Sequence, residues 1–285
     1  MNVSLGIVIN LGILSISYRS RLVFVLLALS FFVYNLAGYN YFLNAFQRNL
    51  IKLVTPVLVF LGYRWVKDES LKRVFFGFFS ISIGFLVARL LVNVPEFFVS
   101  DLDSVMGWGI GKFFEALPIC LSIVVLGKRV GESFTSLGLR GGKGWISLSY
   151  GVLASVLGFV QYFTMVGFSF DFTFSQLASW SPWLILFSFS NALMEELMFR
   201  GLFLGKYTDL LGGRVSLLLI SFVFALFHII LLPFMGLSVV IVFVCFLFLQ
   251  GYVWGFIFER TGSLWGSVFA HAVADILFTL AVFSG

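Results

Sequence analysis

The longest uncharged stretch of the chain limits its fold more than any other feature. Between Val215 and Phe258 there is no Asp, Glu, Lys or Arg in 44 consecutive residues. One helix needs about 20 apolar residues to cross the hydrocarbon of a bilayer, so this stretch predicts two membrane spans with a break near Pro233 and Gly236. The whole chain agrees with this: 60% of its 285 residues are hydrophobic and only 11% are charged. These values are typical of a polytopic membrane protein and exclude an ordinary soluble domain.

Apolar runs separated by charged loops predict ten candidate spans. They cover residues 4–17, 22–39, 49–65, 74–95, 107–127, 145–168, 182–204, 214–232, 236–258 and 264–282. The first and third are short, so we expect an all-α bundle of eight to ten transmembrane helices. The connections are too short to hold a soluble domain.

The signs of the loop charges predict how the helices are oriented. Basic loops carry Arg64, Lys67, Lys72 and Arg73, then Lys128, Arg129, Arg140 and Lys143, then Lys206 and Arg214, then Arg260; acidic connections between them carry Glu96, Asp101, Asp103 and Asp171. The positive-inside rule places the basic loops in the cytoplasm and the C-terminus outside. We expect a multi-pass protein of a prokaryotic cell membrane. The net charge of +5 does not indicate a nucleic-acid partner, because Lys and Arg form no continuous stripe or basic tail.

Two adjacent acids lie inside an apolar segment, at Glu195 and Glu196, and Arg200 follows one turn later. An ionisable side chain near the bilayer centre costs about 2.5–3.5 kcal/mol on insertion scales, so it is by default a candidate functional residue. On a helix Glu196 and Arg200 face each other, whereas Glu195 points about 100° away and is available for another surface. The alternative is that both acids only bond neighbouring helices.

The only two histidines also lie in apolar stretches. Phe224 precedes His228 by one helical turn and could form a wall beside its ring. His271 and Asp275 have i, i+4 spacing, so Asp275 could fix the tautomer of the ring or point toward a shared cavity. Each motif alone also fits a structural role, namely a neutral buried His228 or a local His271–Asp275 pair. By depth along their helices, Glu195 and both histidines are expected to converge in a polar chamber that opens toward the cytoplasm.

In this order and spacing the three motifs resemble the CPBP intramembrane protease family, which includes the CAAX prenyl endopeptidases and bacterial relatives linked to bacteriocin immunity. The family pattern is EExxxR, then FxxxH, then HxxxN or HxxxD, and all three occur between Glu195 and Asp275. The segment GYVWGFIFERTGSLWGSVFAHA also resembles the one that precedes the last motif. The resemblance implies a catalytic membrane core in residues 141–285, whereas residues 1–140 form N-terminal helices without a recognised signature.

The resemblance implies an intramembrane endopeptidase that hydrolyses a membrane-associated peptide or protein. Glu195 is then the general base on a water molecule, and His228 orients that water or shares its proton. His271 and Asp275 lie beside the developing oxyanion. Prenyl endopeptidases usually have Asn at the position of Asp275, so a certain amide donor is replaced here by an acceptor unless the acid is protonated.

Glu196 and Arg200 are expected to support the helix and to fix the direction of Glu195. A zinc-dependent version remains open, in which Glu195, His228 and His271 bind the ion and leave a fourth position for water. These ligands lack the compact HExxH spacing, so we favour chemistry that does not require a metal.

Two other classes of protein compete with the protease. A proton-coupled transporter would also need intramembrane charges, and Arg89, Lys112 and Glu115 are further charges inside predicted spans. Against it, the sequence shows no internal repeat and no matching pair of Gly- or Pro-broken helices. A non-catalytic membrane scaffold of the same family is the third reading, to which Asp275 gives slight support.

Overall fold

A computed structural model of the chain describes residues 43–166, 172–231 and 236–283. These residues are helical and contain no strand, which confirms the all-α class. The elements are α2 (Ala45–Trp65), α3 (Glu69–Leu90), η1 (Val94–Phe97), α4 (Val105–Arg129), α5 (Gly144–Ala154), α6 (Val156–Val166), α7 (Phe174–Glu196), η2 (Leu197–Leu204), α8 (Gly205–Leu211), α9 (Gly213–Phe227), η3 (His228–Leu231), α11 (Leu237–Thr261) and α12 (Trp265–Phe283). The predicted spans 4–17 and 22–39 lie outside the described residues.

Six helices of the described part are long and apolar enough to cross a membrane, and they identify an integral membrane protein. They cover Ala45–Trp65, Glu69–Phe97, Val105–Arg129, Gly144–Thr164, Leu237–Thr261 and Trp265–Phe283. Neither α7, which is rich in Ser and Trp, nor the 15-residue α9 is among them. The total of eight to ten spans therefore stays a prediction.

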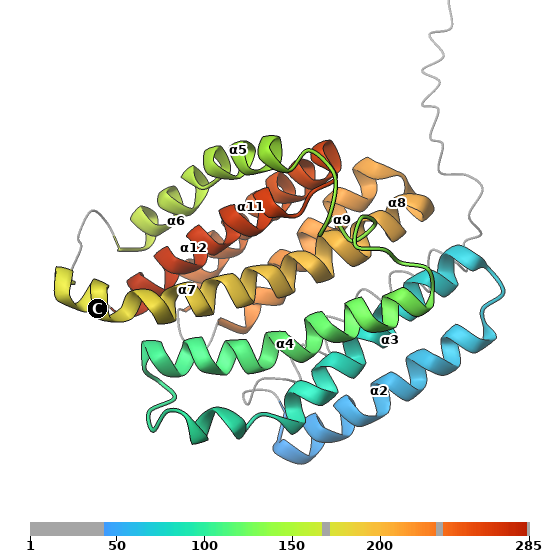
Figure 1. Cartoon of the computed structure of the whole chain (residues 1–285), viewed down its shortest axis with the longest axis horizontal. Coiled ribbons are helices and arrows are strands. Elements are labelled where there is room, and N and C mark those ends of the chain that lie inside the picture. The colour runs from blue at the N-terminus through green and yellow to red at the C-terminus, as the bar shows by residue number, and fades with distance from the viewer. Residues whose placement is uncertain (1–42, 167–171, 232–235, 284–285) are drawn as a thin grey trace, which may run out of the picture.

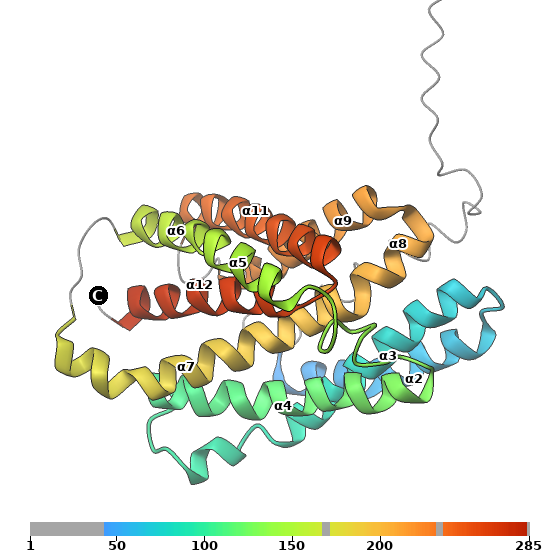
Figure 2. The same ribbon diagram turned by 45° about the horizontal axis from the view of Figure 1, so that its top comes forward.

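Helix α7 lies at the centre of the bundle. Figures 1 and 2 show it between α12 on one side and α4 on the other, and it packs against both. Helices α2 and α3 lie beyond α4, whereas α5, α6 and α11 lie on the other side with α12. Side chains from the C-terminal end of α7 therefore project into the middle of the protein.

Local signals in the sequence set the ends of the helices that carry the site. Helix α7 starts with a capping box: Thr173 accepts a hydrogen bond from the backbone of Gln176, and the Gln176 side chain accepts one from the backbone of Thr173. Helix α11 ends at Thr261 and is followed by Gly262, whose φ of 65° is left-handed and suits glycine. The short turn after Gly262 leads directly into α12.

Three predicted spans differ from the observed helices. The span 145–168 is divided into α5 and α6 at Ser155, whose hydroxyl donates to the Gly151 carbonyl and so competes with regular helical bonding. The span 182–204 begins earlier, at Phe174, and its last part is the π-helical η2. The span 214–232 is an α-helix only as far as Phe227, after which η3 follows.

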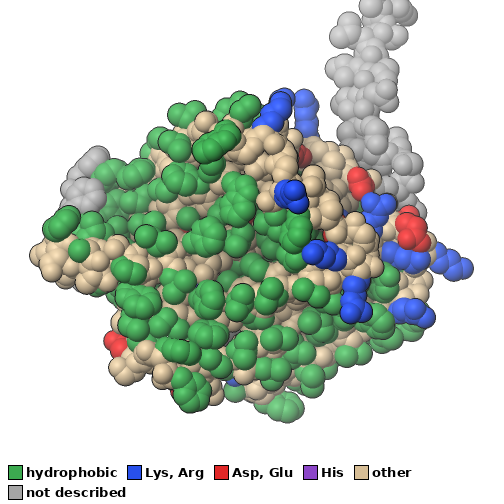
Figure 3. Space-filling model, in the orientation of Figure 1, with side chains coloured by type: hydrophobic (Ala, Val, Ile, Leu, Met, Phe, Trp, Pro, Cys, Tyr) green, Lys and Arg blue, Asp and Glu red, His purple; other side chains and the backbone are tan. Residues whose placement is uncertain are grey.

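Basic side chains gather at one end of the bundle, over the α2–α3 turn and near α8, whereas apolar side chains cover most of the visible face (Figure 3). At this end Lys206 of α8 donates a hydrogen bond to Glu132, which follows α4. Partial burial raises the pKa of Glu132, but the hydrogen bond and the positive charge of Lys206 outweigh this effect and hold that pKa below its usual value. The pair joins the N-terminal helices to the C-terminal half.

Helices α5 and α12 approach each other closely through glycines. The hydroxyl of Ser147 on α5 accepts a hydrogen bond from the backbone of Gly266 (3.0 Å) and donates one to the Ser263 carbonyl (3.0 Å). A Cβ at Gly266 would lie 1.9 Å from the Ser147 carbonyl oxygen. The contact therefore has no room for a side chain at position 266, and it positions the start of the helix that carries His271.

We expect Gly266→Ala to lower the free energy of unfolding by about 1–3 kcal/mol, because the added methyl group forces α5 and α12 apart. Gly111→Ala on α4 is the matched control, since a Cβ there meets no atom within 4 Å. Thermal unfolding in detergent measures both. Equal midpoints for the two variants would contradict the close approach.

Candidate active site

Glu196 and Arg200 form a fully buried ion pair at the junction of α7 and η2. Arg200 Nη1 lies 2.8 Å from Glu196 Oε1, as the i, i+4 spacing predicts, and Nη2 donates to the Gly251 carbonyl of α11 at 2.8 Å. The guanidinium also lies 4.7 Å from the ring centroid of Phe224 on α9 and gains a cation–π contact. One side chain thus connects three helices.

The imidazole of His271 is held from two sides. Its Nδ1 lies 2.9 Å from Glu196 Oε1, and its ring stacks on Trp254 of α11 at 4.4 Å with an interplanar angle of 19°. A carboxylate oxygen only accepts, so Nδ1 carries a hydrogen, and in the neutral form of the ring Nε2 is left with a lone pair. Sequence reasoning proposed Asp275 as the group that could fix this tautomer, but the structure gives that contact to Glu196.

Nε2 of His271 faces two further carboxylates. It lies 3.8 Å from Glu195 Oε2 and 3.7 Å from Asp275 Oδ1. Both distances are too long for direct hydrogen bonds, but an oxygen atom about 2.8 Å from both members of a pair can bridge each gap. Glu195 Oε2 is buried, and no described residue donates a hydrogen bond to it.

Asp275 is bound by Asn191 of α7, a residue that sequence reasoning missed. Asn191 Nδ2 donates to Asp275 Oδ2 at 3.0 Å; Asn191 is buried and Asp275 is partly buried. The signal that could have found it is spacing, because Asn191 precedes Glu195 by one helical turn on the same face. Trp254 was also missed, although it lies in the GYVWG segment that contributed to the family resemblance.

His228 lies at the C-terminal end of α9 and not inside a longer helix. Its Nδ1 donates to the Phe224 carbonyl at 3.0 Å, which leaves Nε2 as an acceptor in the neutral ring. The Phe224 ring lies 5.1 Å from the His228 ring and 5.7 Å from the His271 ring. The predicted wall beside His228 is therefore present, and it also contacts the second histidine.

The structure brings Glu195, His271 and Asp275 together, and the Phe224 ring lies against both His228 and His271. The structure does not support the zinc alternative, in which Glu195, His228 and His271 bind an ion. Across the described ranges, no three His, Cys, Asp or Glu side chains are arranged to hold a metal. We therefore derive no step of the chemistry through an ion.

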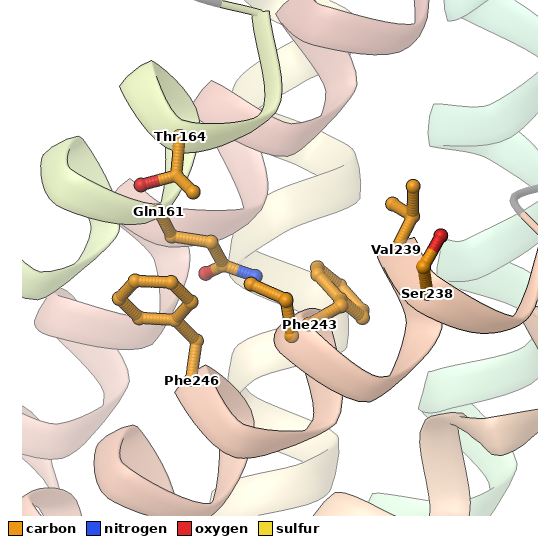
Figure 4. A pocket seen from close by; sticks show the side chains of 7 residues that line it. Gln161, Thr164, Ser238, Val239, Phe243 and Phe246 are labelled. Carbon is orange, nitrogen blue, oxygen red and sulfur yellow. The ribbon is translucent and has the colours of Figure 1, made fainter.

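A pocket of about 280 Å³ lies between α6 and α11 (Figure 4). Its lining consists of Gln161, Thr164, Ser238, Val239, Val242, Phe243 and Phe246. Phe243 connects it to the site, since its ring lies 6.4 Å from His228 and 5.7 Å from Phe278 of α12. The walls are mainly apolar, and the Gln161 oxygen accepts a hydrogen bond from Gln250 at 2.8 Å.

The family model described as type II CAAX prenyl endopeptidase Rce1-like matches residues 177–277. The matched segment contains all three motifs, from Glu195 to Asp275. The resemblance predicted from those motifs is thereby confirmed, and it is a resemblance to a family of membrane proteases. No curated protein and no solved structure matches the chain.

Arg200→Met should lower the free energy of unfolding by about 3–5 kcal/mol, because it leaves Glu196 without its buried counterion. Lys72→Met is the matched control: it removes the cation of the surface pair with Glu69, at 2.7 Å, and should cost less than about 1 kcal/mol. Chemical denaturation in mixed micelles measures both. Similar losses for the two variants would show that the buried pair does not carry this part of the fold.

Proposed function

We propose that this protein is an intramembrane endopeptidase that hydrolyses a peptide bond of a membrane-associated peptide or protein with a water activated by Glu195. The observation that carries the proposal is the buried Glu195 Oε2, which has no hydrogen-bond donor among the described residues and lies 3.8 Å from His271 Nε2. Leaving a buried acceptor unsatisfied costs about 1–3 kcal/mol. A bound water that is consumed in the reaction accounts for this cost, and the protease family match supports the reaction class.

In the first step Glu195 accepts a proton from the water as its oxygen attacks the carbonyl carbon of the substrate. The electron pair of the C=O bond moves onto the carbonyl oxygen, which becomes an oxyanion. His228 contributes an acceptor at Nε2 that orients the water or shares its proton, with its ring restricted by Phe224.

In the second step the electron pair of the oxyanion re-forms the C=O bond as the C–N bond breaks, and the leaving nitrogen takes up the proton that Glu195 removed from the water. His271 is suited to deliver it, because Nε2 faces Glu195 and the Glu196 contact at Nδ1 stabilises the protonated ring. Arg200 neutralises Glu196 in this arrangement. Water supplies the hydroxyl group of the new carboxylic acid and the added hydrogen on the new amine, so the reaction is balanced without a metal or other cofactor.

We also propose an orientation of the protein in the membrane and a route of the substrate to the site. The basic end of the bundle faces the cytoplasm of a prokaryotic cell, as the loop charges indicate. Substrate reaches the site from a membrane-associated position, and the segment to be cleaved unfolds locally to enter the interior. Residues 141–285 form the catalytic core.

Glu195→Gln should lower the rate of peptide cleavage about 10²–10⁴-fold, since the amide cannot accept the proton of the water. Purified protein in liposomes is incubated with a library of membrane-anchored peptides, and products are identified by mass spectrometry. His228→Ala belongs to the same series, and the surface variant Glu69→Gln is the control that keeps full activity. Equal cleavage by all of these variants would contradict the mechanism. Solute or proton transport that requires Glu195 would instead favour a transporter.

The pocket between α6 and α11 is proposed to hold an apolar side chain of the substrate next to the cleaved bond. Val242→Trp should fill it and lower kcat/KM at least tenfold for peptides with large apolar residues near the cleavage position, with less effect on peptides with small ones. Val125→Trp on α4 is the control, since Val125 has a similar exposure but lies outside the pocket. A uniform change across all peptides would contradict the assignment.

A further inference from the structure

We propose that the side-chain amide of Asn191 donates a hydrogen bond to the carbonyl oxygen of the cleaved peptide bond, and that Asp275 positions this amide. The inference rests on the proposed hydrolysis and adds to it the group that stabilises the oxyanion. Asn191 lies on α7 one helical turn before Glu195, and its Nδ2 lies 3.0 Å from Asp275 Oδ2.

The chemistry requires such a donor, because the groups already assigned to the site are mostly acceptors. Glu195 and Asp275 are carboxylates, which repel a developing negative charge. In its neutral form, before it takes up a proton, the His271 ring carries its hydrogen on Nδ1, toward Glu196, and presents a lone pair at Nε2. A preorganised hydrogen-bond donor at the oxyanion is worth about 10²–10³-fold in kcat, and these three side chains do not supply one.

Asn191 has the hydrogens that the site lacks. A carboxylate oxygen only accepts, so the atom that faces Asp275 must be the amide nitrogen and not the amide oxygen. The nitrogen has two hydrogens, and Asp275 takes one of them. No contact in the described part of the chain occupies the second. The amide contacts Oδ2 of Asp275, and Oδ1 of the same carboxylate lies 3.7 Å from His271 Nε2.

This arrangement gives a role to the acid at position 275. Asp275 does not contact the oxyanion in this account; it is a positioning residue that accepts from Asn191 and fixes the amide plane. Helix α12 provides the acceptor Asp275, and helix α7 provides the donor Asn191. The general base Glu195 and the donor Asn191 then lie on one face of α7, so a substrate carbonyl between them meets both.

Trp254 is the competing donor. Its indole Nε1 is buried and has no partner in the described residues, and its ring stacks on His271. Trp254→Phe removes this N–H and keeps an aromatic ring in place. The comparison between Trp254→Phe and the Asn191 variants therefore decides which group acts on the oxyanion.

The test measures kcat and KM for a cleaved membrane-anchored peptide in liposomes. Asn191→Leu should lower kcat about 10²–10³-fold with KM within about threefold, because the lost contact strengthens only in the transition state. Ser188→Ala is the matched control on α7, since Ser188 is also buried and its hydroxyl has no partner among the described residues. It should keep wild-type kcat and thermal stability.

Recovery of kcat by a second substitution distinguishes a chemical role of Asn191 from a structural one. Asn191→Asp keeps the size of the side chain and places two carboxylates together, so kcat should fall as in Asn191→Leu. Adding Asp275→Asn returns an amide to the pair. The double variant should have a kcat at least tenfold higher than that of Asn191→Asp alone. This pair of variants also decides the question if Asn191→Leu does not fold.

Three results would overturn the inference: Asn191→Leu within threefold of wild-type kcat, no rescue of Asn191→Asp by Asp275→Asn, or a loss of kcat in Trp254→Phe that the Asn191 variants do not show. If the wild-type protein cleaves no peptide, the proposed function fails instead. The two failures are thus distinguishable in one set of assays.

Discussion

Arg200 and Glu196 sit fully inside a protein that is otherwise dominated by apolar side chains, and the site depends on how these two charges are satisfied. Burial of an isolated charge is prohibitive, so the guanidinium is paired with Glu196 at 2.8 Å and bonded to the Gly251 carbonyl at 2.8 Å. The same Glu196 oxygen lies 2.9 Å from His271. A single carboxylate therefore connects the packing of α7 and α11 with the tautomer of the histidine on α12.

The adjacent acids consequently have different tasks. Oε1 of Glu196 contacts both Arg200 and His271, whereas Oε2 of Glu195 lies 3.8 Å from the opposite ring nitrogen of His271 and has no donor among the described residues. Asp275 is occupied by Asn191. In our account one acid is structural, one is reactive and one positions an amide. In this account the roles are separated by neighbours and not by residue type, as in enzymes with paired carboxylates.

The contacts within single helices of the candidate site could be predicted from the sequence. Helical spacing predicted the contact of Glu196 with Arg200 and that of Phe224 with His228, because partners four residues apart on one helix need no tertiary information. Contacts between helices could not be predicted in this way. The contact of Asn191 with Asp275 and the stacking of Trp254 on His271 depend on how α7, α11 and α12 pack. The π-helical η2 was also missed, since a hydrophobic pattern does not distinguish it from a regular helix.

The most direct measurement of the central claim is hydrolysis in water enriched in oxygen-18, with the purified protein in liposomes and a membrane-anchored peptide. Direct attack by a water that Glu195 activates predicts that, in a single turnover, the new carboxyl terminus carries one heavy oxygen and that Glu195 carries none. A product without heavy oxygen, or heavy oxygen in the Glu195 side chain, would contradict direct attack by water. Absence of any new carboxyl terminus across the peptide library would contradict the protease itself.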